Sequence, residues 1–443
     1  MDIAKLQNLI YDAGIVGAGG AGFPTHKKLS TQIDEIILNA AECEPLMMVD
    51  HYLLEKHFDK IVEGLKVISN VVDAKRVIVG IKEKNIHLLD KKILKNIEKT
   101  NIVVKVIPDV YPAGDEVMLT YETTGKIIPE GAIPVSVGVM VTNVETVYNV
   151  YKALNGEVVT EKYVTIGGDT EKDITVKVPV GMKISELLEL TDIADLREKT
   201  IINGGPMMGK IVDLENDVVT KTTKGLLIFP DTHPIIQRKK GSVAVNLKRA
   251  MSACCNCTMC SELCPRHLLG YDINVHKTVR AASHGEITNT DAFLQTSLCC
   301  GCGVCTVMGC QQMLDPQAIA MEIKGSLAKH GLKRMNNKAP QEVHPMRTGR
   351  LIASSVLIDR LGIRKYVKES VERDYTEFNP KTVYIALSQH VGKPASPCVK
   401  VGDSVTKGQI VAATEKEALG TTMHASIDGR VTEINEKYVV ISR

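Results

Sequence analysis

Cysteine spacing limits how this 443-residue chain can fold more than any other feature, because ten of its twelve cysteines fall between residues 254 and 310. From residue 254 the first run reads Cys-Cys-Asn-Cys-Thr-Met-Cys-Ser-Glu-Leu-Cys-Pro. From residue 299 the second run reads Cys-Cys-Gly-Cys-Gly-Val-Cys, and a further cysteine follows at 310. The first run fits C-x2-C-x2-C-x3-C-P, the spacing of thiolates that surround [4Fe-4S] clusters. Three such thiolates let one loop cap three corners of a cubane.

The fourth thiolate of each cluster is expected from the other run. One cluster would then be held by Cys254, Cys257, Cys260 and Cys310, and the other by Cys299, Cys302, Cys305 and Cys264. The second run departs from the pattern, since four residues separate its last two cysteines and no proline follows, which leaves its last ligand open. Cys255 and Cys300 are spare at matching places and could replace Cys254 and Cys299 as ligands.

Structural zinc is the alternative, because paired C-x2-C units also form all-cysteine zinc sites. A zinc site needs four thiolates in two pairs, whereas this chain has two evenly spaced triplets, each followed by a fourth cysteine. The spacing therefore favours two iron–sulfur clusters.

Composition excludes several classes of protein. The formal net charge is only +2 and tryptophan is absent, which argues against a nucleic-acid or anionic-membrane partner. No run approaches 18 apolar residues and no signal peptide is evident, so we expect no membrane span. Cysteines outside the two runs stand alone, which disfavours a disulfide framework and favours a cytoplasmic location. The length allows two to four domains.

The N-terminal part, residues 1–155, reads as a Rossmann-like α/β domain. Strands expected at 33–39, 76–80 and 102–106 alternate with helices, which predicts a largely parallel sheet. Five of the nine residues from 14 to 22 are glycine, so backbone N–H groups there could cradle a phosphate, although a plain turn is the alternative. Acidic residues follow the strand at 33–39, where they could receive ribityl or ribose hydroxyls or form a solvated turn.

Four motifs in this domain occur in the same order in the flavin-binding subunit of respiratory complex I, which the chain resembles. They are Gly19-Gly20-Ala21-Gly22-Phe23-Pro24-Thr25, Asn39-Ala40-x-Glu42-x-Glu44-Pro45, Tyr111-x-x-Gly114-x-Glu116 and Asn143-Val144-Glu145-Thr146. The resemblance implies non-covalent FMN, with NADH stacking on it and delivering hydride. Three positions differ from that subunit, which has an acidic residue at Ala41, a serine at Cys43 and a second asparagine at Thr142.

Cofactor contacts are carried over from the resemblance by position. Those implied for the FMN loop and its surroundings are Gly17, Gly19, Gly20, Gly22, Lys28, Asn39, Glu42, Tyr111, Gly114, Asn143 and Thr146. Those implied for the nicotinamide nucleotide are Phe23, Glu44 and Glu116.

Residues 156–245 resemble the β-grasp (SLBB) module that follows the flavin domain in the same family. A hairpin-like pair at 162–168 and 174–181 precedes a short helix, and the glycine-rich segment 203–209 would form a turn near a cofactor or cluster, or a plain turn. We expect residues 246–345 to form an α-helical, ferredoxin-like domain around two [4Fe-4S] clusters. His267, His276 and His284 in that domain are expected to be packing or surface residues.

The C-terminal residues 381–443, after a linker at 346–380, resemble a lipoyl-like β-sandwich, or barrel-sandwich hybrid. Short strands punctuated by glycine support this. The hairpin tip at 424–429 has no lysine to acylate, so we expect a docking or structural module and no swinging carrier.

This set of domains resembles the RnfC family of electron-transfer subunits and the PduS-type family of cobalamin reductases. In RnfC the sandwich precedes the flavin domain, whereas here it is last, which favours the reductase family. The resemblance implies reduction of cob(III)alamin to cob(II)alamin and cob(I)alamin by NADH, serving an adenosyltransferase and a diol dehydratase in a bacterial microcompartment with shell proteins. The alternatives are an RnfC-like subunit that passes electrons between NADH and ferredoxin or another protein, and a cluster-binding scaffold.

Overall fold

A four-stranded parallel sheet is the centre of the N-terminal region of this computed structural model, which describes residues 1–98, 100–191, 195–334, 342–368 and 378–443. The strand order is β3-β2-β1-β5. The strands are β1 (Glu35–Ala40), β2 (Arg76–Lys82), β3 (Ile102–Ile107) and β5 (Val139–Asn143). The parallel sheet expected from the alternation of strands and helices is therefore present, with β1 paired to both β2 and β5.

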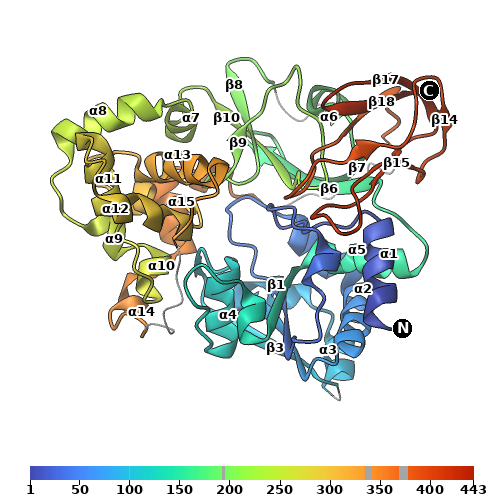
Figure 1. The fold of residues 1–443 in the computed structure, drawn as a ribbon, viewed down its shortest axis with the longest axis horizontal. Coiled ribbons are helices and arrows are strands. Elements are labelled where there is room, and N and C mark those ends of the chain that lie inside the picture. The colour runs from blue at the N-terminus through green and yellow to red at the C-terminus, as the bar shows by residue number, and fades with distance from the viewer. Residues whose placement is uncertain (99, 192–194, 335–341, 369–377) are drawn as a thin grey trace.

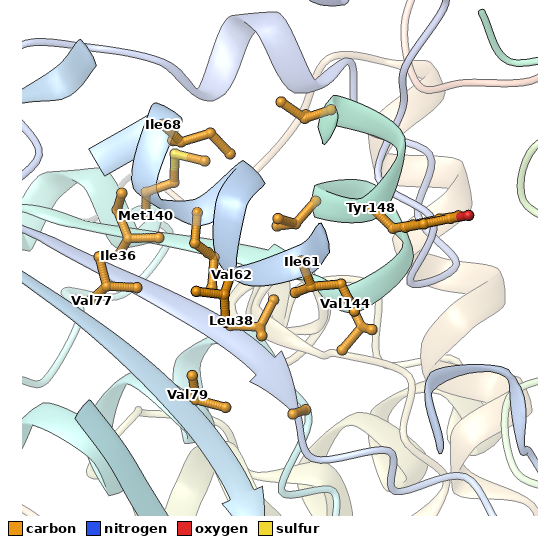
Figure 2. Packing of buried hydrophobic residues seen from close by; sticks show 14 of the residues in the cluster. Ile36, Leu38, Ile61, Val62, Ile68, Val77, Val79, Met140, Val144 and Tyr148 are labelled. Carbon is orange, nitrogen blue, oxygen red and sulfur yellow. The ribbon is translucent and has the colours of Figure 1, made fainter. Parts of the chain in front are cut away.

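Helices cover both faces of this sheet because side chains alternate along each strand. One face packs against α1 (Ile3–Asp12), α2 (Val49–Val72) and α5 (Val144–Leu154). Ile36 and Leu38 of β1 lie on this face; Figure 2 shows Leu38 near Val62 of α2 and Val144 of α5, and Ile36 near Met140 and Val77. Ile37 points to the opposite face and joins the cluster that contains Leu119 of α4 (Glu116–Thr124). The sheet is thus buried on both faces, and its strand ends are the parts left free to build a site.

A second, mixed sheet lies beside the first and has the order β7-β6-β10-β8-β9. Its elements are β6 (Glu161–Gly168), β7 (Ile174–Pro179), α6 (Ile184–Thr191), β8 (Lys199–Asn203), β9 (Lys210–Ile211) and β10 (Gly225–Pro230). The expected hairpin is the antiparallel pair β6 and β7, and β10 returns parallel to β6. In Figure 1 this green sheet lies above the blue and teal N-terminal domain, between the yellow helices on the left and the red C-terminal strands on the right.

Short helices make up the cysteine-rich region, drawn in yellow and orange in Figure 1. They are α7 (Pro234–Lys239), α8 (Val243–Ala253), α9 (Met259–Glu262), α10 (Pro265–Leu268), α11 (Val275–His284), α12 (Thr290–Leu294) and α13 (Pro316–Lys329). The second cysteine run leads into a π-helical turn, Cys305–Gly309. The predicted helical character of this region therefore agrees with the structure.

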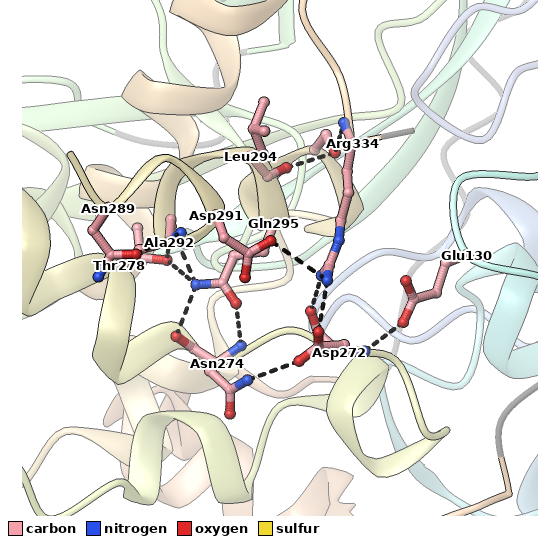
Figure 3. A network of polar contacts seen from close by, with 11 residues as sticks. Glu130, Asp272, Asn274, Thr278, Asn289, Asp291, Ala292, Leu294, Gln295 and Arg334 are labelled. Atoms are coloured by element: carbon pink, nitrogen blue, oxygen red, sulfur yellow. Dashed lines mark hydrogen bonds and ion pairs between the residues drawn. The ribbon is translucent and has the colours of Figure 1, made fainter. Parts of the chain in front are cut away.

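A polar network fixes the approach to the second cysteine run (Figure 3). Arg334 donates to the carboxylate of Asp272 at 2.6 Å, and the backbone N–H of Asp272 donates to Glu130 of the N-terminal domain. Gln295 receives the N–H of Asn274 at 2.6 Å and donates back to its carbonyl at 3.2 Å. Because Gln295 begins the 3-10 helix that ends just before the cysteines, the network ties that loop to the domain across the interface.

The segment expected to be a linker, 346–380, packs as structure over its described residues. It contains α14 (Arg347–Arg350), β11 (Ile352–Ala353) and α15 (Ser354–Leu361), and β11 pairs with β4 (Val110–Tyr111) of the N-terminal domain. Leu357 is fully buried. The apolar residues Leu357 and Leu361 of α15 pack in a core shared with the N-terminal domain, the middle domain and the second cysteine run. Residues 369–377 of the expected linker lie outside the described residues.

Two small sheets form the C-terminal domain, drawn in red in Figure 1. One has the order β12-β18-β17-β14 and the other β13-β15-β16. The strands are β12 (Thr382–Ala386), β13 (Ser396–Pro397), β14 (Ser404–Val405), β15 (Ile410–Ala413), β16 (Met423–His424), β17 (Gly429–Ile434) and β18 (Tyr438–Ser442).

This domain contacts the start of the chain directly. The Thr421 hydroxyl donates to the Tyr11 carbonyl at 2.9 Å, and the Val391 N–H donates to the Gly22 carbonyl at 3.1 Å. The buried ammonium of Lys221 donates to the carbonyls of Gly14 and Thr422 at 2.7 and 2.6 Å, so three domains meet at the glycine-rich loop. Within the described part of the chain, no helix has both the length and the apolar character needed to cross a bilayer.

Candidate cofactor sites

The glycine-rich loop is folded as a closed turn with an open tip. Gly17 donates its N–H to the Phe23 carbonyl at 2.8 Å, and Gly22 donates to the Gly17 carbonyl at 3.2 Å. Gly20 has a φ of +118°, and a Cβ there would meet nothing within 4 Å. A backbone that is exposed and free of Cβ atoms at its tip can approach a phosphate closely, so the loop fits the FMN cradle that the sequence predicted.

Two of the predicted FMN residues face this loop from the end of β5. The Thr146 hydroxyl accepts the Ala18 N–H at 2.9 Å, and the Asn143 side chain lies 3.6 Å from the position of a Cβ on Gly19. Asn143 also caps α5 by accepting the Glu145 N–H at 3.0 Å. The loop therefore sits where strand β5 ends and helix α5 begins, which is where anions bind in parallel α/β domains.

Lys28, Phe23 and Glu116 lie together on another side of the loop. The Lys28 ammonium is 2.7 Å from the Glu116 carboxylate and 5.9 Å from the centre of the Phe23 ring, and it donates to the Val141 carbonyl at 3.0 Å. Glu116 is half-exposed at the start of α4. This group places a cation, an aromatic ring and a carboxylate next to one another, and the resemblance implied these residues for FMN and NADH.

Asn39 and Gly114 meet at the end of β1. The Asn39 amide donates to the Gly114 carbonyl at 2.8 Å, and a Cβ on Gly114 would lie 3.1 Å from the Cys43 sulfur. Burial raises the pKa of Cys43 to about 12. A neutral thiol therefore occupies the position for which the resemblance gave a serine.

Glu42 takes part in a buried ion pair that the sequence did not reveal. Lys224, from the turn before β10 of the middle domain, contacts both Glu42 and Asp50, at 2.7 Å for Asp50. Asp50 also accepts the Asn143 amide at 3.0 Å. A second pair across the same interface, Lys162 with Glu145, is 1% exposed on both sides. The order of the sequence motifs located Glu42 and Glu145. It could not reveal their partners Lys224 and Lys162, because both lysines belong to the middle domain.

Glu44 is held by the glycine-rich segment 203–209 of the middle domain. Its two carboxylate oxygens accept the N–H groups of Met207 and Met208 at 3.1 and 2.9 Å. A Cβ on Gly205 would lie 2.1 Å from the same carboxylate, so only glycine permits this approach. Burial raises the pKa of Glu44 to about 7, although the two N–H donors favour the ionised form. The glycine-rich segment therefore contacts one of the residues predicted to bind the nicotinamide nucleotide, and its position near a cofactor stays a prediction.

Tyr111 connects the N-terminal domain to the second cysteine run. Its buried hydroxyl donates to the Cys302 carbonyl at 2.8 Å and lies 3.5 Å from the Glu44 carboxylate. Close by, Arg266 of the first run pairs with Asp115 at 2.8 Å, and Asp115 caps α4. The hydroxyl of Tyr111, a predicted flavin contact, is therefore hydrogen-bonded to the loop of the second cysteine run.

The eight predicted cluster ligands gather around two separate cavities. Cys254, Cys257, Cys260 and Cys310 line one cavity, and Cys264, Cys299, Cys302 and Cys305 line the other. Each set combines three thiols of one run with the last thiol of the other, as cross-ligation requires. Four thiols around each cavity fit two [4Fe-4S] clusters with cysteine ligands only. A zinc site built from two C-x2-C pairs would group the cysteines differently. Cys255 lines the first cavity and Cys300 the second, so their role as alternative ligands stays a prediction.

Chain segments that line the two cavities contact each other, and the cysteines of the two sets differ in exposure. A Cβ on Gly309 would lie 2.8 Å from the Cys260 backbone, which brings the π-helical turn of one set against helix α9 of the other. Cys264, Cys302 and Cys305 are buried, whereas Cys257 is exposed. His276 lines the first cavity and its ring contacts the Ser261 hydroxyl at 2.8 Å.

A further group of side chains has the composition of a metal site. In Glu262, His267 and His344, the atoms that could bind a metal ion lie within 4.8 Å of one another, although Glu262 is already paired with Arg350.

Three family models match consecutive parts of the chain. The Nuo51 FMN-binding domain matches residues 10–152, the 4Fe-4S dicluster domain matches 253–315, and the RnfC barrel-sandwich hybrid domain matches 365–442. The molecule is therefore a multidomain protein with an FMN-binding domain, a dicluster domain and a barrel-sandwich domain, as predicted.

Curated relatives extend the similarity to the whole length. The chain is 37% identical over 448 residues to the cobalamin reductase PduS of Citrobacter freundii, covering 100% of this chain and 97% of the relative. It is 36% identical to the PduS of Salmonella typhimurium, covering 99% and 96%. One component of the Na(+)-translocating ferredoxin:NAD(+) oxidoreductase complex of Acetobacterium woodii is 30% identical over only 60% of this chain and 59% of the relative.

Proposed function

Because the chain belongs to the family of PduS-type cobalamin reductases, we propose that it oxidises NADH and delivers the electrons singly to the cobalt of cobalamin. Its FMN-binding and dicluster domains make it an NADH-dependent flavin and iron–sulfur oxidoreductase. FMN supplies the conversion of a two-electron hydride donor into single electrons, and the clusters supply one-electron conduction.

The contact that carries the proposal is the hydrogen bond from Tyr111 to the Cys302 carbonyl. Tyr111 belongs to a predicted flavin motif, and Cys302 belongs to the buried set of four thiols. The bond joins the predicted flavin site to one cluster cavity without an intervening domain. Short separation between redox centres is what single-electron transfer needs, so this contact supports an enzyme over a cluster-binding scaffold.

The chain's own residues would bind and orient the two nucleotides. The loop Gly17–Gly22, which is exposed at Gly19, Gly20 and Ala21, would receive the FMN phosphate through backbone N–H groups, and Lys28 would bring a positive charge nearby. We assign Phe23, Glu44 and Glu116 to the nicotinamide nucleotide. The bonds from the 203–209 segment fix Glu44 in position before any nucleotide arrives.

The two accessory domains fit more specific assignments. The mixed sheet with β10 parallel to β6 and one covering helix supports a β-grasp domain of SLBB type at residues 156–245. The paired small sheets at 381–443 support a lipoyl-like sandwich. The Ser426 hydroxyl at its predicted tip is buried and donates to the Val180 carbonyl at 2.6 Å, so this tip docks on the middle domain.

We also propose that the protein resides in a bacterial microcompartment with an adenosyltransferase and shell proteins. Co-purification with these proteins would test this location.

The test is anaerobic NADH oxidation with hydroxocobalamin, ferredoxin and a dye offered in turn. Flavin absorbance at ~450 nm should be bleached by NADH, because hydride transfer is the chemistry of the cofactor. Reduction of hydroxocobalamin supports the reductase. Transfer to ferredoxin and the dye but not to hydroxocobalamin would favour an RnfC-like electron-input subunit.

A further inference from the structure

The two sets of thiols differ in how they meet the solvent, and this difference indicates where electrons leave the protein. In the set next to Tyr111, Cys264, Cys302 and Cys305 are between 7% and 9% exposed. In the other set Cys257 is exposed, and so is its neighbour Cys255. Because electron tunnelling weakens steeply with distance, an acceptor in solution is served by the exposed set.

The surface around the exposed thiols combines amides with methionine side chains. Asn256, Gln311 and Gln312 line the cavity and are exposed. Met259 is 37% exposed and Met313 is 76% exposed, and each stands within three residues of a thiol of this set. We call these five residues the first-cluster face. The two methionines place soft, polarisable apolar side chains beside amide donors and acceptors.

Charged residues are few in the two chain segments that carry the first-cluster face, and those present are positive. Residues 242–261 and 299–314 contain no Asp or Glu, and their only Lys or Arg residues are Lys248 and Arg249. Glu262, which follows directly, is paired with Arg350. A ligand that is neutral and amide-rich, with a single negative group, matches this surface better than a basic protein would.

We propose that the first-cluster face binds the corrinoid itself. Cobalamin has a broad ring with apolar faces, carboxamide groups around its edge and one phosphodiester. The methionines would contact the ring, the three amides would bond the carboxamide fringe, and Lys248 or Arg249 would lie near the phosphodiester. The inference rests on the proposed function and adds to it a place of contact, with free cobalamin as the occupant.

The stoichiometry of the reaction follows from single-electron transfer at this face. Each docking event reduces one Co(III) to Co(II) by one electron, with no bond formed between protein and corrinoid. One NADH supplies two electrons and becomes NAD+ with release of one proton, so two Co(III) are reduced per NADH. No other reductant is required.

Protection of a cysteine from alkylation tests docking without any turnover. The oxidised, cluster-loaded protein is treated with iodoacetamide with and without cyanocobalamin, whose cyanide ligand prevents capture of the cobalt by a thiol. Cys255 should become protected, whereas the exposed Cys398 of the C-terminal domain should be alkylated equally in both samples. Equal alkylation of Cys255 with and without cyanocobalamin would overturn the proposal.

A pair of variants tests the face by affinity. Met313→Asp should weaken cyanocobalamin binding about tenfold in equilibrium dialysis, since it removes an apolar contact and adds a negative charge. Met346→Asp changes another exposed methionine, 55% against 76% for Met313, outside the two cysteine runs and should bind as wild type. Variants are compared only when their iron and FMN contents match.

The outcomes separate the face from the function. Wild-type affinity in Met313→Asp overturns the docking site even if hydroxocobalamin is reduced. Failure of the wild type to reduce hydroxocobalamin overturns the proposed function, and with it this inference.

Discussion

Lys224 offers the sharpest test of how the middle domain supports the flavin site. Its side chain is 12% exposed and lies between the carboxylates of Glu42 and Asp50, which are 8% and 3% exposed. Lys224→Met leaves two buried carboxylates without a cation. Removing one partner of a buried ion pair costs about 3–5 kcal/mol. For a domain of this size we expect the temperature of FMN release, followed by flavin fluorescence, to fall by roughly 6–20 °C.

The effect should depend on pH in a defined direction. Burial raises the pKa of Glu42, and the neighbouring Lys224 charge opposes that rise. Without the lysine the pKa of Glu42 rises further, so the folded variant binds a proton more tightly than the unfolded chain. The deficit is therefore larger at high pH, where Glu42 is charged, and shrinks as the pH falls, because protonation of Glu42 removes its repulsion with Asp50.

Controls for this prediction lie in the same chain. Lys407→Met breaks another interdomain pair, with Glu161 at 2.9 Å, but Lys407 is 47% exposed and the loss should stay below about 1 kcal/mol. Adding Asp50→Asn to Lys224→Met should restore part of the stability. A deficit for Lys224→Met that equals that of Lys407→Met, or that is the same at pH 5 and pH 8, would refute the reasoning.

Three further predictions concern the path from nucleotide to cluster. Cys257→Ala should reduce the iron content from about eight to about four atoms per chain. The variant should no longer reduce one-electron acceptors, whereas NADH should still bleach its flavin. Loss of flavin reduction in a folded variant would contradict this order of carriers. Tyr111→Phe leaves the Cys302 carbonyl without its hydrogen-bond donor and should lower the free energy of unfolding by about 1–3 kcal/mol. On heating, the cluster absorbance should then be lost at a lower temperature. An unchanged temperature would argue against the Tyr111–Cys302 hydrogen bond. Glu44 has a pKa of about 7 in the folded protein, so its contribution makes stability fall as pH rises from about 4.5 to 7. Glu44→Gln should flatten that part of the melting profile, and an unaltered profile would show that Glu44 does not titrate there.

Local spacing explains why much of the architecture could be predicted. The distribution of thiols between two cavities follows from the positions of cysteines along a few turns of chain, and the α/β alternation follows from apolar runs such as 76–80. Family resemblance added the flavin domain, which the match over residues 10–152 supports. These features depend on residues close together in sequence.

Features that depend on two distant segments could not be predicted. The cation between Glu42 and Asp50 comes from Lys224, and the donors to Glu44 come from Met207 and Met208. No pattern in the N-terminal domain signals either. Packing of the segment 346–368 could not be predicted for the same reason, because the burial of Leu357 depends on a core that other domains supply.

The attachment of the C-terminal domain to the first helix bears on how such proteins acquire different domain orders. Thr421 and Thr422 both donate to the Tyr11 carbonyl at 2.9 Å, so the last domain rests where the chain starts. A module held by lateral contacts of this kind could be joined through either terminus with little change in the interface. Relatives in which the sandwich precedes the flavin domain could therefore have the same arrangement of domains and differ only in which terminus is joined to the sandwich.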